Sequence, residues 1–230
     1  MSWRVALIDS CGSWPRAAAA AAFARTDHDI ERRAPVLDPT GHGSRIAALL
    51  TAGEDAVDLL LGQVFLNAEA TSAAAVAAAL DWSVSSGARL IHLSLGITRD
   101  RPVLSNAVRQ AIEAGAIVVA STPARGVTVF PASYPGVIQA TGDARCGPGD
   151  LSRLAPMRFG GCPWPATPPA GDTQAARARG GASVGAAWVS KAILSLPPAA
   201  PTAEVVKALN ARANFWGPER RGTPGEVAFS

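Results

Sequence analysis

The chain has 230 residues, of which 48% are hydrophobic and 17% charged. A chain of this length can bury one substantial core, and we expect a single domain over residues 1–230. The net charge is only +3 and the arginines are scattered, which argues against a nucleic-acid partner.

Short apolar runs predict the strands, which are Trp3 to Asp9, Val57 to Leu66, Ala88 to Leu95, Ala116 to Ala120 and Val137 to Thr141. The predicted helices are Ala17 to Ala24, His42 to Leu50, Thr71 to Ser86, Val103 to Ala114, Ser183 to Leu196 and Thr202 to Arg212. A Gly- and Pro-rich stretch, 143–181, predicts an irregular crossover. Strands that are apolar throughout are typical of a parallel sheet covered on both faces. We therefore expect an α/β fold, a three-layer α/β/α sandwich with a mostly parallel central sheet.

Three short segments carry the residues of a nucleophilic mechanism. Asp9 ends the apolar run VALID (5–9), His42 lies in DPTGHGS (38–44), and Ser183 lies in GGASVGAA (180–187). A serine hydroxyl is a weak nucleophile until a base takes its proton, and an imidazole titrates near neutrality. A carboxylate can hold that imidazole in the required tautomer. Taken singly, each residue is more typical of a turn, a loop or a helix cap.

Two other hydrolase arrangements do not fit the chain order. Residues 181–185 read G-x-S-x-G, the nucleophile elbow of the α/β-hydrolases, but that fold needs its histidine after the serine. The histidines here are His28, His42 and His92, all before Ser183. The order His42, Asp81, Ser183 would match chymotrypsin, whose fold is all-β, whereas this chain alternates strands and helices.

The order of Asp9, His42 and Ser183, with their local motifs, resembles the subtilisin-like serine proteases, the subtilases. The resemblance implies that these three residues form the catalytic triad. The segment HLSLG (92–96) resembles the family segment that lines the substrate groove, which implies substrate binding by Ser94, Leu95 and Gly96. We interpret His92, in the same strand, as a core histidine without a catalytic role.

The chain departs from the family where the oxyanion hole is expected. Family members have Ala-Gly-Asn after the corresponding strand, and the asparagine donates a hydrogen bond to the developing oxyanion. Here Pro123 and Ala124 stand in place of Gly-Asn, so that donor is missing. The oxyanion-hole region then comprises the Ser183 amide and the segment around Ala124, where Thr122 or Arg125 is a candidate substitute donor.

The family resemblance implies a serine endopeptidase that works through an acyl-enzyme. The first strand begins almost at Met1, so we expect neither a propeptide nor a signal sequence. Cys11, Cys146 and Cys162 match no disulfide framework, which favours a reducing compartment and a cytoplasmic location. No apolar run reaches the roughly 18 residues of a membrane span, and we expect no membrane partner and no required metal or other cofactor.

A protease in the cytoplasm requires narrow specificity, weak activity or dependence on a partner. We expect a processing protease whose substrate is a peptide or protein, for example a precursor with a leader segment, and an accessory maturation protein as a further partner. The alternative is a catalytically weak or inactive subtilase-like protein that binds peptides, because Ala124 replaces the oxyanion-hole asparagine.

Overall fold

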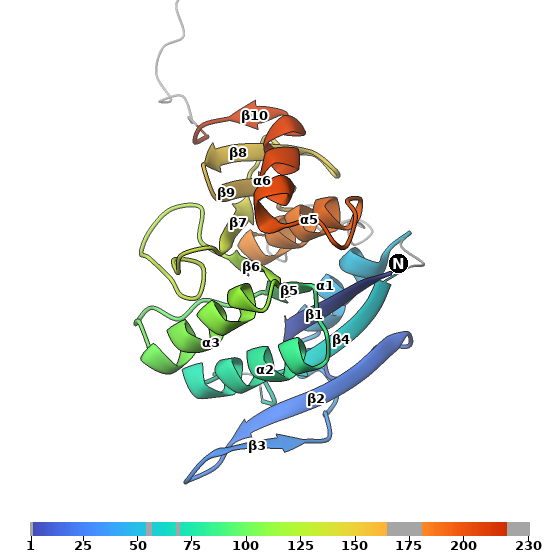
Figure 1. Cartoon of the computed structure of the whole chain (residues 1–230), viewed down its shortest axis with the longest axis vertical. Coiled ribbons are helices and arrows are strands. Elements are labelled where there is room, and N and C mark those ends of the chain that lie inside the picture. Colours follow the sequence, from blue (N-terminus) through green and yellow to red (C-terminus); the bar gives the residue numbers. More distant parts are fainter. Residues whose placement is uncertain (1, 54–56, 68–69, 165–180, 220–230) are drawn as a thin grey trace, which may run out of the picture.

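The computed structural model describes residues 2–53, 57–67, 70–164 and 181–219. Within these residues ten strands form one sheet, in the order β10-β8-β9-β7-β6-β5-β1-β4-β2-β3 (Figure 1). The strands are β1 Trp3–Asp9, β2 Ala17–Arg25, β3 Ile30–Arg33, β4 Val57–Gln63, β5 Leu90–Leu93, β6 Ile117–Ser121, β7 Ile138–Gly142, β8 Leu151–Ala155, β9 Arg158–Gly161 and β10 Phe215–Trp216. The helices are α1 His42–Thr51, α2 Ala73–Ser85, α3 Pro102–Glu113, α5 Ala182–Leu194 and α6 Thr202–Ala211.

The centre of the sheet is parallel, as expected from strands that are apolar throughout. Strand β1 pairs in parallel with β4 on one side and β5 on the other, and β5, β6, β7 and β9 continue the parallel pairing. Only the β2–β3 and β8–β9 pairs are antiparallel among the paired strands of the described ranges. Residues that follow β1, β5, β6 and β7 therefore meet at one edge of the sheet, where open α/β folds place their ligands.

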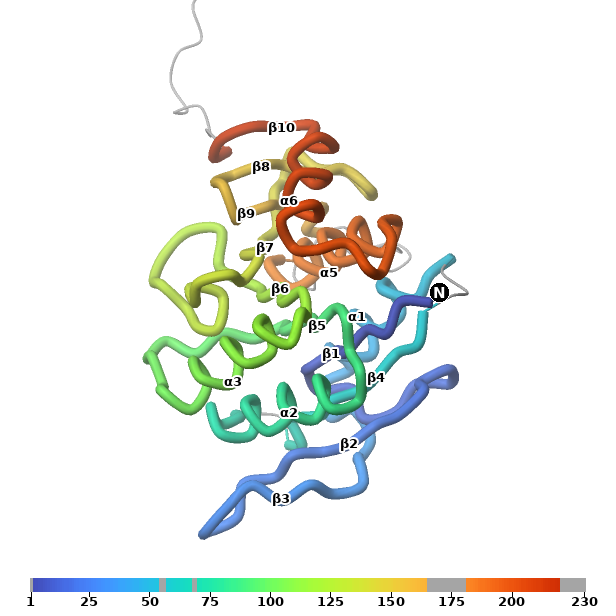
Figure 2. Tube along the Cα trace, viewed as in Figure 1, coloured from blue at the N-terminus to red at the C-terminus, as the bar shows by residue number. Residues whose placement is uncertain are grey.

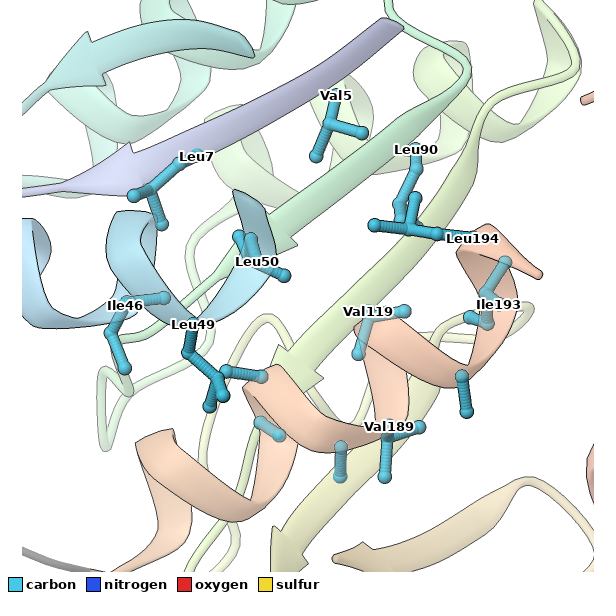
Figure 3. Close-up of a cluster of buried hydrophobic side chains, with 14 of the residues drawn as sticks. Val5, Leu7, Ile46, Leu49, Leu50, Leu90, Val119, Val189, Ile193 and Leu194 are labelled. Atoms are coloured by element: carbon cyan, nitrogen blue, oxygen red, sulfur yellow. The ribbon is translucent and has the colours of Figure 1, made fainter. Parts of the chain in front are cut away.

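Alternation along β1 divides the core into two layers. Val5 and Leu7 lie in the cluster that α1 and α5 cover (Figure 3), and Ala6 and Ile8 lie in the cluster that α2 and α3 cover. Because side chains alternate across a strand, Asp9 has the parity of Val5 and Leu7 and points to the face of α1 and α5. The three-layer α/β/α prediction is confirmed.

The helix predicted at Ala17 to Ala24 is wrong, because this segment is the strand β2. Its backbone pairs with the open edge of β4, with Ala20 opposite Leu61, and its second half pairs with β3. Strands β2 and β3 run beside each other in the Cα trace of Figure 2. Alanine favours a helix by less than about 1 kcal/mol per residue over most other residues, a preference that sheet pairing and packing override. The small side chains let α2 pack closely on β2, where the Phe23 and Trp82 rings lie 5.9 Å apart.

The irregular crossover expected over 143–181 contains two strands in its described part. Strands β8 and β9 form an antiparallel pair that extends the sheet beyond β7. Residues 165–180 of this segment lie outside the described residues. Across the described ranges, no helix combines the length and apolar character needed to cross a membrane.

Candidate active site

Asp9 and His42 are in direct contact at the carboxyl edge of the parallel strands. Asp9 is the last residue of β1 and is only 2% exposed. Both of its carboxylate oxygens lie 2.9 Å from His42 Nδ1, and the Ser10 amide donates to Oδ1 at 2.6 Å. A carboxylate only accepts hydrogen bonds, so Nδ1 carries the proton and Nε2 of the neutral ring is left with a free lone pair.

The start of helix α1 presents the His42 ring to this carboxylate. Gly41 precedes the helix with φ at +65°, a left-handed conformation that suits glycine and turns the chain so that His42 begins the first turn. The His42 side chain remains 34% exposed. The hydrogen bond that His42 donates to Asp9 raises the pKa of His42 above its usual value of 6.5, against the opposing effect of burial. This ring can therefore accept a proton and hold it.

A second carboxylate, which the sequence analysis missed, orders the loop before His42. Asp38 accepts hydrogen bonds from the Gly41 amide at 2.8 Å, the Ser44 amide at 2.8 Å and the Ser44 hydroxyl at 2.7 Å. Burial alone would raise the pKa of Asp38, but the hydrogen bonds from Ser44 outweigh it and lower the pKa to about 2. The signal was an aspartate followed by proline, a threonine and a glycine immediately before a helix.

Close packing also fixes α1 against the end of β1. The Ser10 hydroxyl accepts from the Gly43 amide at 2.9 Å and lies 3.0 Å from the Thr40 hydroxyl. A side chain at Gly43 would place its Cβ 2.3 Å from the Cys11 amide nitrogen, so only glycine fits there. The histidine is thus held both by the loop before it and by the residue after it.

Ser183 is the second residue of α5 and is partly buried. The helix starts against the end of β7, because a Cβ at Gly185 would lie 2.2 Å from the Thr141 carbonyl oxygen and 2.5 Å from Gly142 Cα. The Gly181 amide donates to the Pro163 carbonyl at 2.8 Å. Since β7 and β1 run in the same direction, α5 begins at the same edge of the sheet as α1.

The first turns of helices α1 and α5 also lie at about the same level along the two helix axes. Lys191 Nζ on α5 donates to the carbonyl oxygens of Leu49, at 3.2 Å, and of Ala52. Leu49 follows His42 by seven residues and Lys191 follows Ser183 by eight, roughly 10 and 12 Å along the two helix axes. The two helices pack side by side in Figure 3, and their first turns carry His42 and Ser183. The structure therefore brings Asp9 and His42 into contact and places Ser183 at the same edge.

A cavity of about 260 Å³ opens beside the Asp9–His42 pair. Its lining residues are Asp9, Ser10, Thr40, His42, Phe65 and Ser94. Ser94 follows β5, and the structure thus brings this predicted binding residue to the histidine. The Leu95 side chain is buried in the α2–α3 layer, so only its main chain is available to a peptide. Gly96 is exposed, and a Cβ there would lie 3.1 Å from Val129.

None of the residues of the predicted oxyanion-hole segment, Thr122, Ala124 and Arg125, lines that cavity. Thr122 is buried and its amide donates to the Ala140 carbonyl. Ala124 and Arg125 line a separate cavity of about 180 Å³, together with Thr141 and Arg158. Arg125 is exposed and its guanidinium donates to the Glu219 carbonyl at 3.5 Å. Neither proposed substitute donor lines the cavity beside His42.

A second histidine–serine pair lies deeper in the same layer. His92 Nδ1 is 2.8 Å from the Ser190 hydroxyl, a spacing that a base and its nucleophile would have. Both residues are 0% exposed, and the other ring nitrogen is 2.7 Å from the Ser94 hydroxyl. A substrate cannot reach this pair, so its geometry is that of a satisfied core histidine. Asp81 lies on α2, on the opposite face of the sheet from α1.

The three cysteines of the chain are free and buried. Burial raises the pKa of each thiol, to about 12 for Cys146. Cys11 lies next to the site, where its thiol donates to the Ser13 carbonyl at 3.3 Å. Among the residues that the structure describes, no group of three or more His, Cys, Asp or Glu side chains could hold a metal ion.

Comparison with curated proteins finds two relatives. A model of the subtilase family matches residues 9–154, which include Asp9 and His42. A thermostable alkaline protease of Halalkalibacterium halodurans is 29% identical over 150 residues, which are 59% of this chain and 40% of that protein. The alkaline elastase YaB of Bacillus sp. (strain YaB) is 28% identical over 110 residues, which are 43% of this chain and 29% of that protein. The chain thus spans less than half the length of the curated relatives it matches.

Solved structures with similar folds include three proteases. A psychrophilic protease has a TM-score of 0.60 at 16% identity, over 92% of this chain and 82% of its own. The prenylagaramide maturation protease PagA has a TM-score of 0.60 at 18% identity, over 91% and 82%. A lanthipeptide protease has a TM-score of 0.51 at 21% identity, over 61% and 48%. These structural similarities concern the fold. Because the family model covers more than half of the sequence, the chain belongs to the subtilase family of serine proteases.

Proposed function

We propose that this chain is a serine endopeptidase that hydrolyses peptide bonds with Asp9, His42 and Ser183 as its catalytic triad. The observation that carries the proposal is the contact of both Asp9 oxygens with His42 Nδ1 beside a cavity. The start of α5 at the same edge supports Ser183 as the nucleophile. The family model ends at residue 154, so Ser183 rests on its motif and its place in the fold.

The first half of the reaction forms an acyl-enzyme. His42 Nε2 takes the proton of the Ser183 hydroxyl while Ser183 Oγ attacks the carbonyl carbon of the scissile peptide bond. Asp9 stabilises the imidazolium that forms and keeps its own negative charge. The tetrahedral intermediate collapses, the C–N bond breaks, and His42 passes the proton to the leaving amine.

The second half regenerates the enzyme. His42 Nε2 takes a proton from a water molecule whose oxygen attacks the acyl carbon. The ester bond to Ser183 Oγ breaks, and His42 returns the proton to that oxygen. Serine is thereby restored and the second product leaves as a carboxylic acid. The raised pKa of His42 suits both roles, because its ring accepts protons readily near neutral pH.

The oxyanion is stabilised by fewer donors than in a typical subtilase. The Ser183 amide lies in the first turn of α5, where amides have no partner within the helix. Ala124 offers no side-chain donor, and the guanidinium of Arg125 is directed to Glu219. In subtilisin, removing one oxyanion-hole donor costs roughly 100- to 1,000-fold in turnover. We therefore expect slow turnover, which suits a protease that cuts one substrate.

We propose a precursor peptide or protein with a leader segment as the substrate. The support is the fold similarity to the prenylagaramide maturation protease and to the lanthipeptide protease. Residues 94–96 offer an extended segment to which a peptide strand could add by main-chain hydrogen bonds. An accessory maturation protein is the partner we expect if the purified chain needs help to present the substrate.

We also propose a cytoplasmic location. The support is the three buried thiols, since a reducing compartment keeps cysteines unpaired. Fractionation of the source cells with an antibody to the chain tests this, and recovery from the medium would contradict it.

A fluorophosphonate probe tests the proposed nucleophile. Such a probe forms a covalent bond with an activated serine, and intact mass measures one added label per chain. We expect labelling of the wild type and its loss in Ser183→Ala and in His42→Ala. Ser13→Ala is the matched control, because Ser13 is an exposed serine near the site and should leave labelling unchanged. Labelling that persists in Ser183→Ala would overturn the assignment.

The second candidate function is peptide binding without hydrolysis, which the missing donor at Ala124 favours. It predicts that the wild type stays unlabelled, alone or with source-cell extract, while a precursor peptide still binds. Labelling only with extract would instead indicate a protease that depends on a partner.

A further inference from the structure

A row of three hydrogen-bonding side chains leads from helix α5 to the cavity beside His42. Ser190 on α5 lies 2.8 Å from His92 Nδ1, and His92 Nε2 lies 2.7 Å from the Ser94 hydroxyl. Ser190 and His92 are 0% exposed, whereas Ser94 is 8% exposed and lines the cavity with Asp9 and His42. The row thus has a closed end at Ser190 and an open end at Ser94.

The closed end fixes where the protons lie. His92 is the one hydrogen-bond partner of the Ser190 hydroxyl in the described part of the chain. If Ser190 accepted from Nδ1, its own O–H would be buried without an acceptor, which is unfavourable. Ser190 therefore donates to Nδ1. Burial lowers the pKa of His92 to about 4, so the ring is neutral near pH 7 and its single proton lies on Nε2.

The open end then has a defined polarity. Nε2–H donates to Ser94 Oγ, which leaves the Ser94 hydrogen free to turn toward the cavity. The contact with His92 is the one hydrogen bond of the Ser94 hydroxyl among the described residues, although Asp9 and the free lone pair of His42 Nε2 line the same cavity. The Ser94 O–H is thus a donor that a ligand in the cavity can engage.

We propose that His92 is a positioning residue that holds the Ser94 hydroxyl as a hydrogen-bond donor to a main-chain carbonyl oxygen of the peptide substrate. This inference rests on the proposed function. An extended peptide alternates N–H and C=O groups along its edge, so a strand laid along residues 94–96 brings a carbonyl oxygen to Ser94. Nε2–H already occupies one of the two lone pairs of Ser94 Oγ, whereas the Ser94 O–H still needs an acceptor. The row therefore favours a carbonyl over an amide N–H at this position.

Nitrogen NMR of the full chain labelled with 15N-histidine tests the proton placement without any activity. The chain has three histidines, so the signal that survives in both His28→Gln and His42→Ala belongs to His92. We expect His92 to be neutral at pH 7 with its proton on Nε2. A proton on Nδ1 would overturn the proposal.

A double-mutant cycle on kcat/KM tests whether Ser190 acts through Ser94. One hydrogen bond is worth about 0.5–1.5 kcal/mol, so Ser94→Ala should lower kcat/KM roughly two- to tenfold, chiefly through KM. Ser190→Ala should lower kcat/KM in the wild type and have no further effect in Ser94→Ala. Equal losses in both backgrounds would show a merely structural role and overturn the proposal.

Ser83→Ala is the matched control. Ser83 is also a 0% exposed helix serine, but it lies on α2 and its hydroxyl donates to the Ala79 carbonyl at 2.6 Å. We expect it to leave kcat/KM unchanged. If the wild type neither hydrolyses peptides nor reacts with the fluorophosphonate, the proposed protease function fails. The same cycle is then run on the Kd of the peptide, where loss of coupling between Ser190 and Ser94 would still refute the role of His92.

Discussion

Replacing Asp38 by asparagine should destabilise the chain by an amount that depends on pH. The lowering of the Asp38 pKa from 3.8 to about 2 corresponds to about 2 kcal/mol of folding free energy, at about 1.36 kcal/mol per pH unit. Asp38 is partly exposed, and solvent screening reduces this to about 1–2 kcal/mol. Because the folded-state pKa is depressed, the stabilisation is fully present above about pH 4 and is lost as the pH falls toward 2.

Urea denaturation at a series of pH values measures this effect. We expect the free energy of unfolding of Asp38→Asn to be about 1–2 kcal/mol lower than that of the wild type at pH 7. This difference should shrink between pH 4 and pH 2. Asp27→Asn is the control, since Asp27 is an exposed carboxylate in the turn between β2 and β3. A difference that stays constant from pH 7 to pH 2 would show that the carboxylate charge of Asp38 does not stabilise the fold.

Three further predictions concern the site. Asp9→Asn should lower kcat roughly 10⁴-fold, because an amide can hold the imidazole in the wrong tautomer. It should also move the acid limb of the kcat/KM–pH profile, which lies above pH 6.5 in the wild type, to lower pH; a steady-state pH series measures both effects, and an unmoved limb would contradict the role of Asp9. Ala124→Asn should raise kcat by restoring a side-chain amide donor, at most by the roughly 100- to 1,000-fold that one oxyanion-hole donor contributes in subtilisin. A peptide hydrolysis assay that finds no gain would show that this position does not face the oxyanion. Gly43→Ala should lower the free energy of unfolding, measured by thermal denaturation, by about 1–3 kcal/mol or more, because its Cβ would lie 2.3 Å from the Cys11 amide nitrogen. Gly147→Ala, whose Cβ would have its nearest neighbour at 3.4 Å, should lower it less, and equal losses would contradict the close packing at Gly43.

The sequence predicted those parts of the molecule whose signals are local. Strand β1, its terminal Asp9 and the glycines around His42 all lie within short segments, and the three-layer fold follows from strands that are apolar throughout. The contact between Asp9 and His42 was predicted from the family motif and is seen at 2.9 Å. The pairing of β1 with β4 and β5 follows the parallel arrangement expected of such runs.

Features that depend on distant neighbours could not be predicted in this way. Strand β2 is alanine-rich, and only the free edge of β4 makes it extended. The row from Ser190 to Ser94 joins residues 96 positions apart in the chain, so no local pattern reveals it. The segment before His42 reads as a simple turn, and two of the hydrogen bonds to Asp38 come from Thr40 and Gly41 within it. The two from Ser44 form only when the first turn of α1 is in place, so the role of Asp38 at the site was not evident from the sequence.

The attachment of Lys191 to α1 has a consequence for motion. Lys191 joins the C-terminal halves of the two helices, while their first turns are held by glycine contacts and by the Asp38 loop. Opening of the backbone should therefore be graded along α5, and amide hydrogen exchange should be slowest around residues 189–193 and faster near Ser183. Neutralising Lys191, for example by acetylation, would remove the difference in amide exchange rate between the two ends of α5. The helix that carries Ser183 would then open locally along its whole length.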